Sequence, residues 1–112
     1  MLYTLEDDMS KVVNESEFNS LISSEKIVVV DFYADWCGPC KIMSGVLEEI
    51  EAELAGKATV CKVNVDEDGP LAEKYGVVTI PNINIIVNGE SVKNFIGVTS
   101  KEDIVSIVNS YI

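Results

Sequence analysis

The chain has no histidine and no arginine, and its eight lysines stand against 19 acidic residues, which gives a formal net charge of −11. Without histidine, neither a Ser-His-Asp nor a Cys-His nucleophilic centre can form. Such an acidic chain repels the phosphates of nucleic acids, so we do not expect it to bind DNA or RNA. The simplest interpretation of the charge is a well-solvated surface, and selection of positively charged partners is the alternative.

Cysteine is also scarce, with three residues in the chain. Three cysteines without histidine cannot supply the four ligands of the usual zinc site, or hold a four-cysteine iron–sulfur cluster within one chain. Their odd number also argues against a disulfide framework. We therefore expect no metal and no cofactor, and a redox dithiol plus one further cysteine is the simplest arrangement.

Long apolar runs are absent too, since none reaches the roughly 18 residues that a membrane-spanning helix needs. Residues 1–8 are acidic, and we expect them to form a short N-terminal extension. They lack the basic and apolar regions that are typical of a signal peptide. A chain of 112 residues, 47% of them hydrophobic, suits one compact domain over 1–112. We expect a cytoplasmic monomer that does not bind membranes.

What the chain does contain is a pair of cysteines, Cys37 and Cys40, within a Trp-Cys-Gly-Pro-Cys sequence. The preceding run 27–33 is almost continuously apolar and predicts a strand covered on both faces. The run 41–54 has apolar residues at helical spacing, and proline suits a first helical turn, so a helix should begin at Pro39 or Cys40. The two thiols therefore lie at a strand-to-helix junction, where loops commonly carry chemistry.

The position of each thiol predicts its role. Unpaired N–H groups and the helix dipole at a helix N-terminus stabilise a thiolate, so Cys37 should be the more exposed thiol, with the lower pKa, and should attack a disulfide. Cys40, one turn inward, can then release the mixed disulfide by attacking Cys37. Half of a zinc site looks the same, but here the partner ligands are missing.

Three nearby residues extend this hypothesis. Asp31 interrupts the apolar strand, so burial should raise its pKa and allow proton exchange with Cys40, unless it is a strand-end acid that reaches water. Lys62 lies in a strand predicted over 59–65, where it either tunes Asp31 or is an ordinary surface lysine. Cys61 should point to the opposite face and pack as a small buried residue.

The remaining elements complete an α/β fold, a mixed sheet of about five strands flanked on both faces by about four helices. Asn14 with Glu17 predicts a capping box, and Asn88-Gly89 is a strong hairpin signal. Further strands are expected at 10–13, 83–87 and 91–96, and further helices at 15–24, 68–76 and from Thr99 or Ser100 onward. The apolar side of the last helix is expected to comprise Ile104, Val105, Ile107, Val108 and Ile112.

Together these motifs resemble the thioredoxin family over roughly residues 9–112. The matching segments are Asp-Phe-Tyr-Ala-Asp-Trp-Cys-Gly-Pro-Cys-Lys at 31–41, Lys-Val-Asn-Val-Asp at 62–66, Thr-Ile-Pro at 79–81, Asn-Gly-Glu at 88–90 and the glycine at 97. The Gly-Pro dipeptide between the two cysteines distinguishes thioredoxins from related proteins. Disulfide isomerases typically carry Gly-His at these two positions, and glutaredoxins carry Pro-Tyr. The resemblance implies a thioredoxin fold and protein-disulfide reductase activity, with Cys37 as nucleophile and Cys40 as resolving thiol.

The resemblance also implies roles for surrounding residues. Asp31 would match the family's buried acid, Lys62 the lysine beside it, and Pro81 a cis-proline facing the dithiol. From its own position, Pro81 would be an ordinary proline at a strand start. The backbone around Ile80 would pair with an extended substrate segment. An apolar contact surface would comprise Trp36, Gly38, Pro39, Ile80, Gly97 and Val98, although core packing would be the default for the tryptophan alone.

The implied partners are disulfide-containing client proteins and a thioredoxin reductase, usually a flavin enzyme that uses NADPH. The sequence departs from the family pattern at three positions: Tyr33 replaces a frequent tryptophan, Gly45 a frequent helix-kinking proline, and Asn82 a frequent threonine. None belongs to the dithiol, so we expect the mechanism to be retained. A redox-independent binding subunit and an oxidase or isomerase domain are the alternatives, and the intact Cys-Gly-Pro-Cys sequence argues against both.

Overall fold

The structure is a computed structural model that describes residues 11–112. Five strands form one mixed sheet, as expected, and their order in it is β1-β3-β2-β4-β5. The strands are β1 (Lys11–Val12), β2 (Ile27–Tyr33), β3 (Thr59–Asn64), β4 (Asn82–Val87) and β5 (Glu90–Ile96), and the helices are α2 (Glu15–Ser24), α3 (Gly38–Glu53), α4 (Gly69–Lys74) and α5 (Lys101–Asn109). The predicted extension 1–8 and Ser10 lie outside the described residues.

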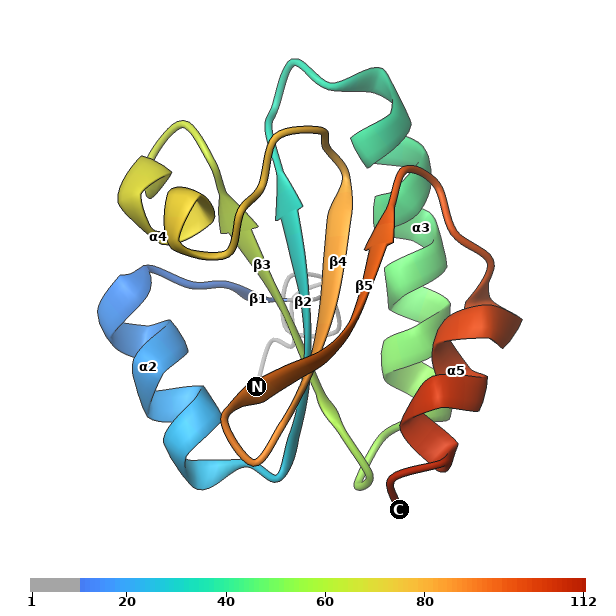
Figure 1. Ribbon diagram of the computed structural model, residues 1–112. Coiled ribbons are helices and arrows are strands. Elements are labelled where there is room, and N and C mark those ends of the chain that lie inside the picture. The colour runs from blue at the N-terminus through green and yellow to red at the C-terminus, as the bar shows by residue number, and fades with distance from the viewer. Residues whose placement is uncertain (1–10) are drawn as a thin grey trace, which may run out of the picture.

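Helices cover both faces of the sheet, with α2 and α4 on one face and α3 and α5 on the other (Figure 1). Strand β2 lies at the centre and supplies alternate side chains to two separate hydrophobic cores. Ile27 and Val29 pack with α3 and α5, whereas Val28, Val30 and Phe32 pack on the face of α2. The apolar run therefore forms the doubly covered strand that it predicts.

Local signals account for two element boundaries. The capping box of α2 is complete, because Asn14 Oδ1 accepts a hydrogen bond from the Glu17 N–H at 2.8 Å and Glu17 Oε1 accepts one from the Asn14 N–H at 2.9 Å. In the turn between β4 and β5, Asn88 and Gly89 have φ of 51° and 84°. Both angles lie in the left-handed region that this dipeptide tolerates, which confirms the predicted hairpin.

The last helix is shorter than expected. Its N-cap is Ser100, whose hydroxyl accepts a hydrogen bond from the Asp103 N–H at 3.2 Å. The helix ends at Asn109, so Ile112 lies beyond it and is 61% exposed instead of completing the apolar side. Within residues 11–112, no helix is long and apolar enough to cross a bilayer.

The sheet topology brings distant segments together at one edge. Strands β2 and β3 are parallel and both end there, whereas β4 is antiparallel to β2 and begins there. Strand β5 is antiparallel to β4 and therefore ends at the same edge. Figure 1 shows the loop from β2 to α3 beside the loop that enters β4. Three loops that are far apart in the sequence thus meet around the start of α3.

Candidate active site

A disulfide between Cys37 and Cys40 closes the first turn of α3. The helix begins at Gly38, ahead of the predicted start at Pro39 or Cys40, because Cys37 itself is the N-cap and its Sγ accepts a hydrogen bond from the Cys40 N–H at 3.2 Å. This sulfur therefore lies at the free N–H groups of a helix N-terminus, where negative charge is stabilised. In the disulfide form Cys37 is only slightly more exposed than Cys40, at 5% against 3%.

The loop that enters β4 lies against the dithiol. The Ile80 carbonyl oxygen is 3.9 Å from Cys37 Sγ, and the Ile80–Pro81 peptide bond is cis. The cis form agrees with the family resemblance, whereas the position of the proline alone had indicated an ordinary strand start. The Gly97 N–H donates to the Pro81 carbonyl at 2.8 Å, which ties the end of β5 to this loop. Ile80 also packs against the small cluster of Ala34 and the two cysteines.

Exposed apolar side chains lie on the loops that meet at this edge. Trp36 is 71% exposed instead of packing in the core, and its indole Nε1 donates to Asp66 Oδ2 at 2.8 Å. Val98 is 51% exposed. Gly38 and Pro39 are exposed as well, whereas Ile80 and Gly97 are half-buried. Asp66 was not predicted as a site residue, although it follows β3 within the matched segment 62–66.

Asp31 is completely buried in β2, so it is not a strand-end acid that reaches water. Neither carboxylate oxygen has a hydrogen-bond partner among the described residues. Desolvation by burial raises the pKa of Asp31 from 3.8 to about 7, and the positive charge of Lys62 partly opposes this rise. The predicted direction is confirmed, and this carboxyl group changes its charge near neutral pH.

Lys62 lies beside Asp31 in the register of β3 with β2. The lysine is half-buried, so it is not an ordinary surface lysine. Its Nζ donates to Ser44 Oγ at 3.0 Å and lies 4.4 Å from the centroid of the Tyr33 ring. These groups border a cavity of about 150 Å³ whose lining residues are Tyr33, Ala34, Asp35, Cys40, Lys41, Ser44 and Lys62. The cavity therefore joins Cys40 to the Lys62 ammonium.

Cys61 points to the opposite face of the sheet, as strand alternation predicts. It is 1% exposed and packs with Val28, Val30 and Phe32. Burial, helped by the nearby charge of Asp31, raises the pKa of Cys61 to about 12. This thiol therefore stays protonated and is a packing residue.

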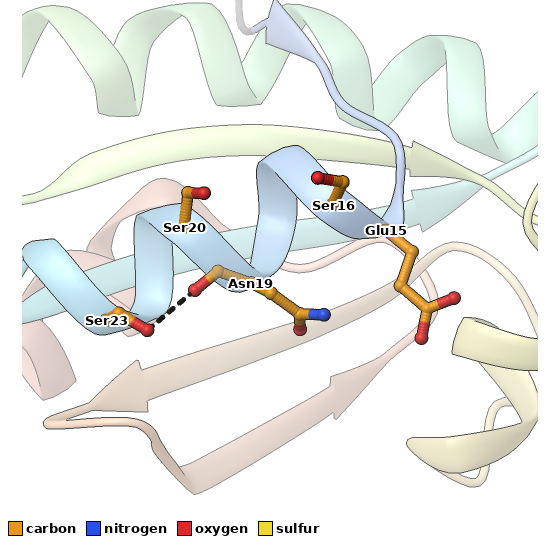
Figure 2. Close-up of a pocket in the computed structure, with 5 residues that line it drawn as sticks. All are labelled: Glu15, Ser16, Asn19, Ser20 and Ser23. Carbon is orange, nitrogen blue, oxygen red and sulfur yellow. Dashed lines mark hydrogen bonds between the residues drawn. The ribbon is translucent and has the colours of Figure 1, made fainter.

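A larger hollow lies away from these groups. It has a volume of about 710 Å³ and runs along α2, where Figure 2 shows its lining residues: Glu15, Ser16, Asn19, Ser20 and Ser23. The Ser23 hydroxyl donates a hydrogen bond to the Asn19 backbone carbonyl oxygen at 2.9 Å. Because α2 and α3 cover opposite faces of the sheet, this hollow has no part in the dithiol chemistry (Figure 1).

A disulfide at a helix N-terminus, beside a loop with a cis-proline, in a fold whose central strand buries a carboxyl group with a pKa raised to about 7, is the arrangement of a thiol–disulfide oxidoreductase. The family model described as Thioredoxin matches residues 9–110. This chain belongs to the thioredoxin family. It is a thiol–disulfide oxidoreductase of the protein-disulfide-reductase type, and its partners are disulfide-containing client proteins.

Three relatives illustrate the similarity, and the matched segment covers most of each of them. A thioredoxin of Chlamydia caviae is 39% identical over 103 residues, which are 92% of this chain and 99% of that protein. A thioredoxin of Bacillus subtilis is 41% identical over 80% of this chain and 86% of its own length. The solved structure of a mutant thioredoxin from Halobacterium salinarum is 34% identical and has a TM-score of 0.84, over 97% of this chain and 96% of that chain.

Proposed function

We propose that the reduced chain passes two electrons to a disulfide of a client protein, with Cys37 as the attacking thiolate and Cys40 as the resolving thiol. The Cys37 thiolate attacks one client sulfur, the client disulfide breaks, and the departing client thiolate takes up a proton. Cys40 then loses its proton and attacks Cys37, which forms the intramolecular disulfide and releases the second client thiolate. The position of Cys37 Sγ at the N-cap of α3 carries this assignment.

Asp31 is the proposed acceptor of the Cys40 proton. Its carboxyl group has a pKa raised to about 7 by burial, so near neutral pH it can take up or give back a proton. Lys62 is the neighbouring charge that moderates this pKa. Asp31→Asn is expected to slow resolution by Cys40 and to flatten its pH dependence, whereas an unchanged pH–rate profile would remove Asp31 from the mechanism.

Client recognition and electron supply complete the proposal. An extended client segment pairs with the backbone of Ile80 beside Pro81, as in strand addition, and contacts the apolar surface around it. That surface comprises Trp36, Gly38, Pro39, Ile80, Gly97 and Val98. A flavin reductase that uses NADPH returns the dithiol to its reduced form. The protein works without a metal as a cytoplasmic monomer, in one domain over residues 1–112.

Two cysteine variants test the assignment in an insulin-disulfide reduction assay. Cys37→Ser is expected to abolish turnover, because it removes the attacking sulfur. Cys40→Ser is expected to stop turnover after one step and to accumulate a mixed disulfide with the client, which mass spectrometry detects. Cys61→Ser is the matched control and should keep the parent rate. Turnover by Cys40→Ser at the parent rate would contradict the mechanism.

A further inference from the structure

The Lys62 ammonium is hydrogen-bonded to a side chain of α3 and not to the neighbouring carboxylate of Asp31. Strand pairing places Lys62 next to Asp31 on the same face of the sheet. The Asp31 oxygens nevertheless have no hydrogen-bond partner within the described part of the chain, while Lys62 Nζ donates to Ser44 Oγ at 3.0 Å. The ammonium therefore acts on the carboxylate through space, from a position that another side chain fixes.

We propose that Ser44 is a positioning residue for the dithiol reaction, whose hydroxyl holds the Lys62 ammonium against the Tyr33 ring and so sets the electrostatic effect of that ammonium on Asp31. This proposal deepens, and rests on, the proposed role of Asp31 as proton acceptor for Cys40. Ser44 touches no reacting sulfur and acts only through Lys62.

The placement of Ser44 on α3 fits this role. Residues four apart on a helix share one face, and Ser44 follows Cys40 by four positions, so both line the cavity of about 150 Å³. The Tyr33 ring, 4.4 Å from Lys62 Nζ, offers its electron-rich face to the same ammonium. A lysine side chain has many rotamers, and two contacts that converge on its ammonium restrict them.

The charged groups around this cavity predict whether loss of the Ser44 hydroxyl makes Asp31 easier or harder to ionise. Asp35 and Lys41 also line the cavity, and both side chains are exposed. On the far face Cys61 stays protonated because burial raises its pKa to about 12, and β4 places the apolar Ile83 beside Asp31. Without the Ser44 hydroxyl, water and the exposed Asp35 carboxylate draw the Lys62 ammonium outward. Asp31 then loses part of the opposing positive charge and becomes harder to ionise.

The test is a titration of the Asp31 carboxyl carbon by NMR in the oxidised, full-length protein. Ser44→Ala is expected to raise the titration midpoint, by less than Lys62→Met raises it. Ser44→Thr keeps a hydroxyl and should restore the parent midpoint. Ser20→Ala, a serine of α2 on the other face of the sheet, is the matched control and should leave the midpoint unchanged. In a Lys62→Met background, Ser44→Ala should add no further shift.

Kinetics separate this inference from the proposed function. Stopped-flow reaction of the reduced protein with a chromogenic aromatic disulfide gives two successive thiolate releases, and the second reports resolution by Cys40. In Ser44→Ala, the pH profile of this second release should shift upward together with the titration midpoint of Asp31. An unchanged or lowered Asp31 midpoint in Ser44→Ala, or a shift that persists without Lys62, would overturn the positioning role. A raised midpoint without a change in the resolution profile would instead refute Asp31 as the proton acceptor.

Discussion

At the scale of single residues, Asp31 shows how an apolar strand changes the chemistry of a carboxyl group. It is completely buried in the central strand, and its oxygens have no hydrogen-bond partner among residues 11–112. Desolvation therefore raises its pKa to about 7, against the opposing charge of Lys62. Burial of Asp31 therefore costs the folded protein less free energy when the carboxyl group is protonated than when it is ionised.

The raised pKa of Asp31 predicts a pH-dependent stability. Because its pKa rises from 3.8 in the unfolded chain to about 7 in the folded one, ionisation of Asp31 costs no stability below about pH 4, costs more as the pH rises from there to about 7, and costs a constant amount above that. Asp31→Asn removes this effect and should stabilise the oxidised protein by about 4 kcal/mol at pH 8, and by much less at pH 5. Urea unfolding at both pH values measures the difference. The exposed Glu67→Gln is the control, and an equal gain at both pH values for Asp31→Asn would contradict the prediction.

The sequence predicted some of these residues and missed others. Asp31 and Cys61 were predictable because a strand alternates its faces and a buried charge shifts its pKa. Ser44 and Asp66 were not, because their partners lie 18 and 30 residues away in the sequence. The first contact depends on how α3 lies over β3 and the second on how two loops meet, and hydrophobic spacing carries no information about either.

At the scale of elements, local chemistry determined most boundaries. The capping box at Asn14 and the Asn88-Gly89 turn were readable because the side chain or the positive φ acts within three residues. Helix α3 begins before both of its predicted starts, Pro39 and Cys40, because a cysteine sulfur, and not one of the usual oxygen caps, takes the N-cap position. That exception places Cys37 at the helix N-terminus.

Gly45 provides a test of α3 itself. It lies within the helix, and an added Cβ there would meet no heavy atom within 4 Å beyond its chain neighbours and the backbone of its own helix. Gly45→Ala should therefore stabilise the protein by about 1 kcal/mol in urea unfolding, because alanine loses less backbone entropy in a helix. Gly76→Ala, at φ +68°, is the contrasting variant and should destabilise by about 1 kcal/mol. If Gly45→Ala lowers stability, the local packing of α3 differs from this description.

At the scale of the whole molecule, the active site is a product of sheet topology. The dithiol, the loop with Pro81 and the segment at Gly97 come from three distant parts of the chain, and they meet because β2 and β5 end where β4 begins. Hydrophobic periodicity predicted the strands but not their order. The family resemblance supplied only the expectation that Pro81 faces the dithiol and that Gly97 and Val98 lie on the same contact surface.

The proposed mechanism requires that folding makes the Cys37 sulfur reactive, and alkylation of Cys37 tests this most directly. The reduced protein is treated with iodoacetamide across a pH series, folded and in urea, and modification of each cysteine is followed by mass spectrometry. In the folded protein the Cys37 rate should have a midpoint clearly below the value of about 8.5 for an ordinary thiol, with Cys61 unmodified, and this shift should vanish in urea. A Cys37 midpoint near 8.5 in both states would contradict the account.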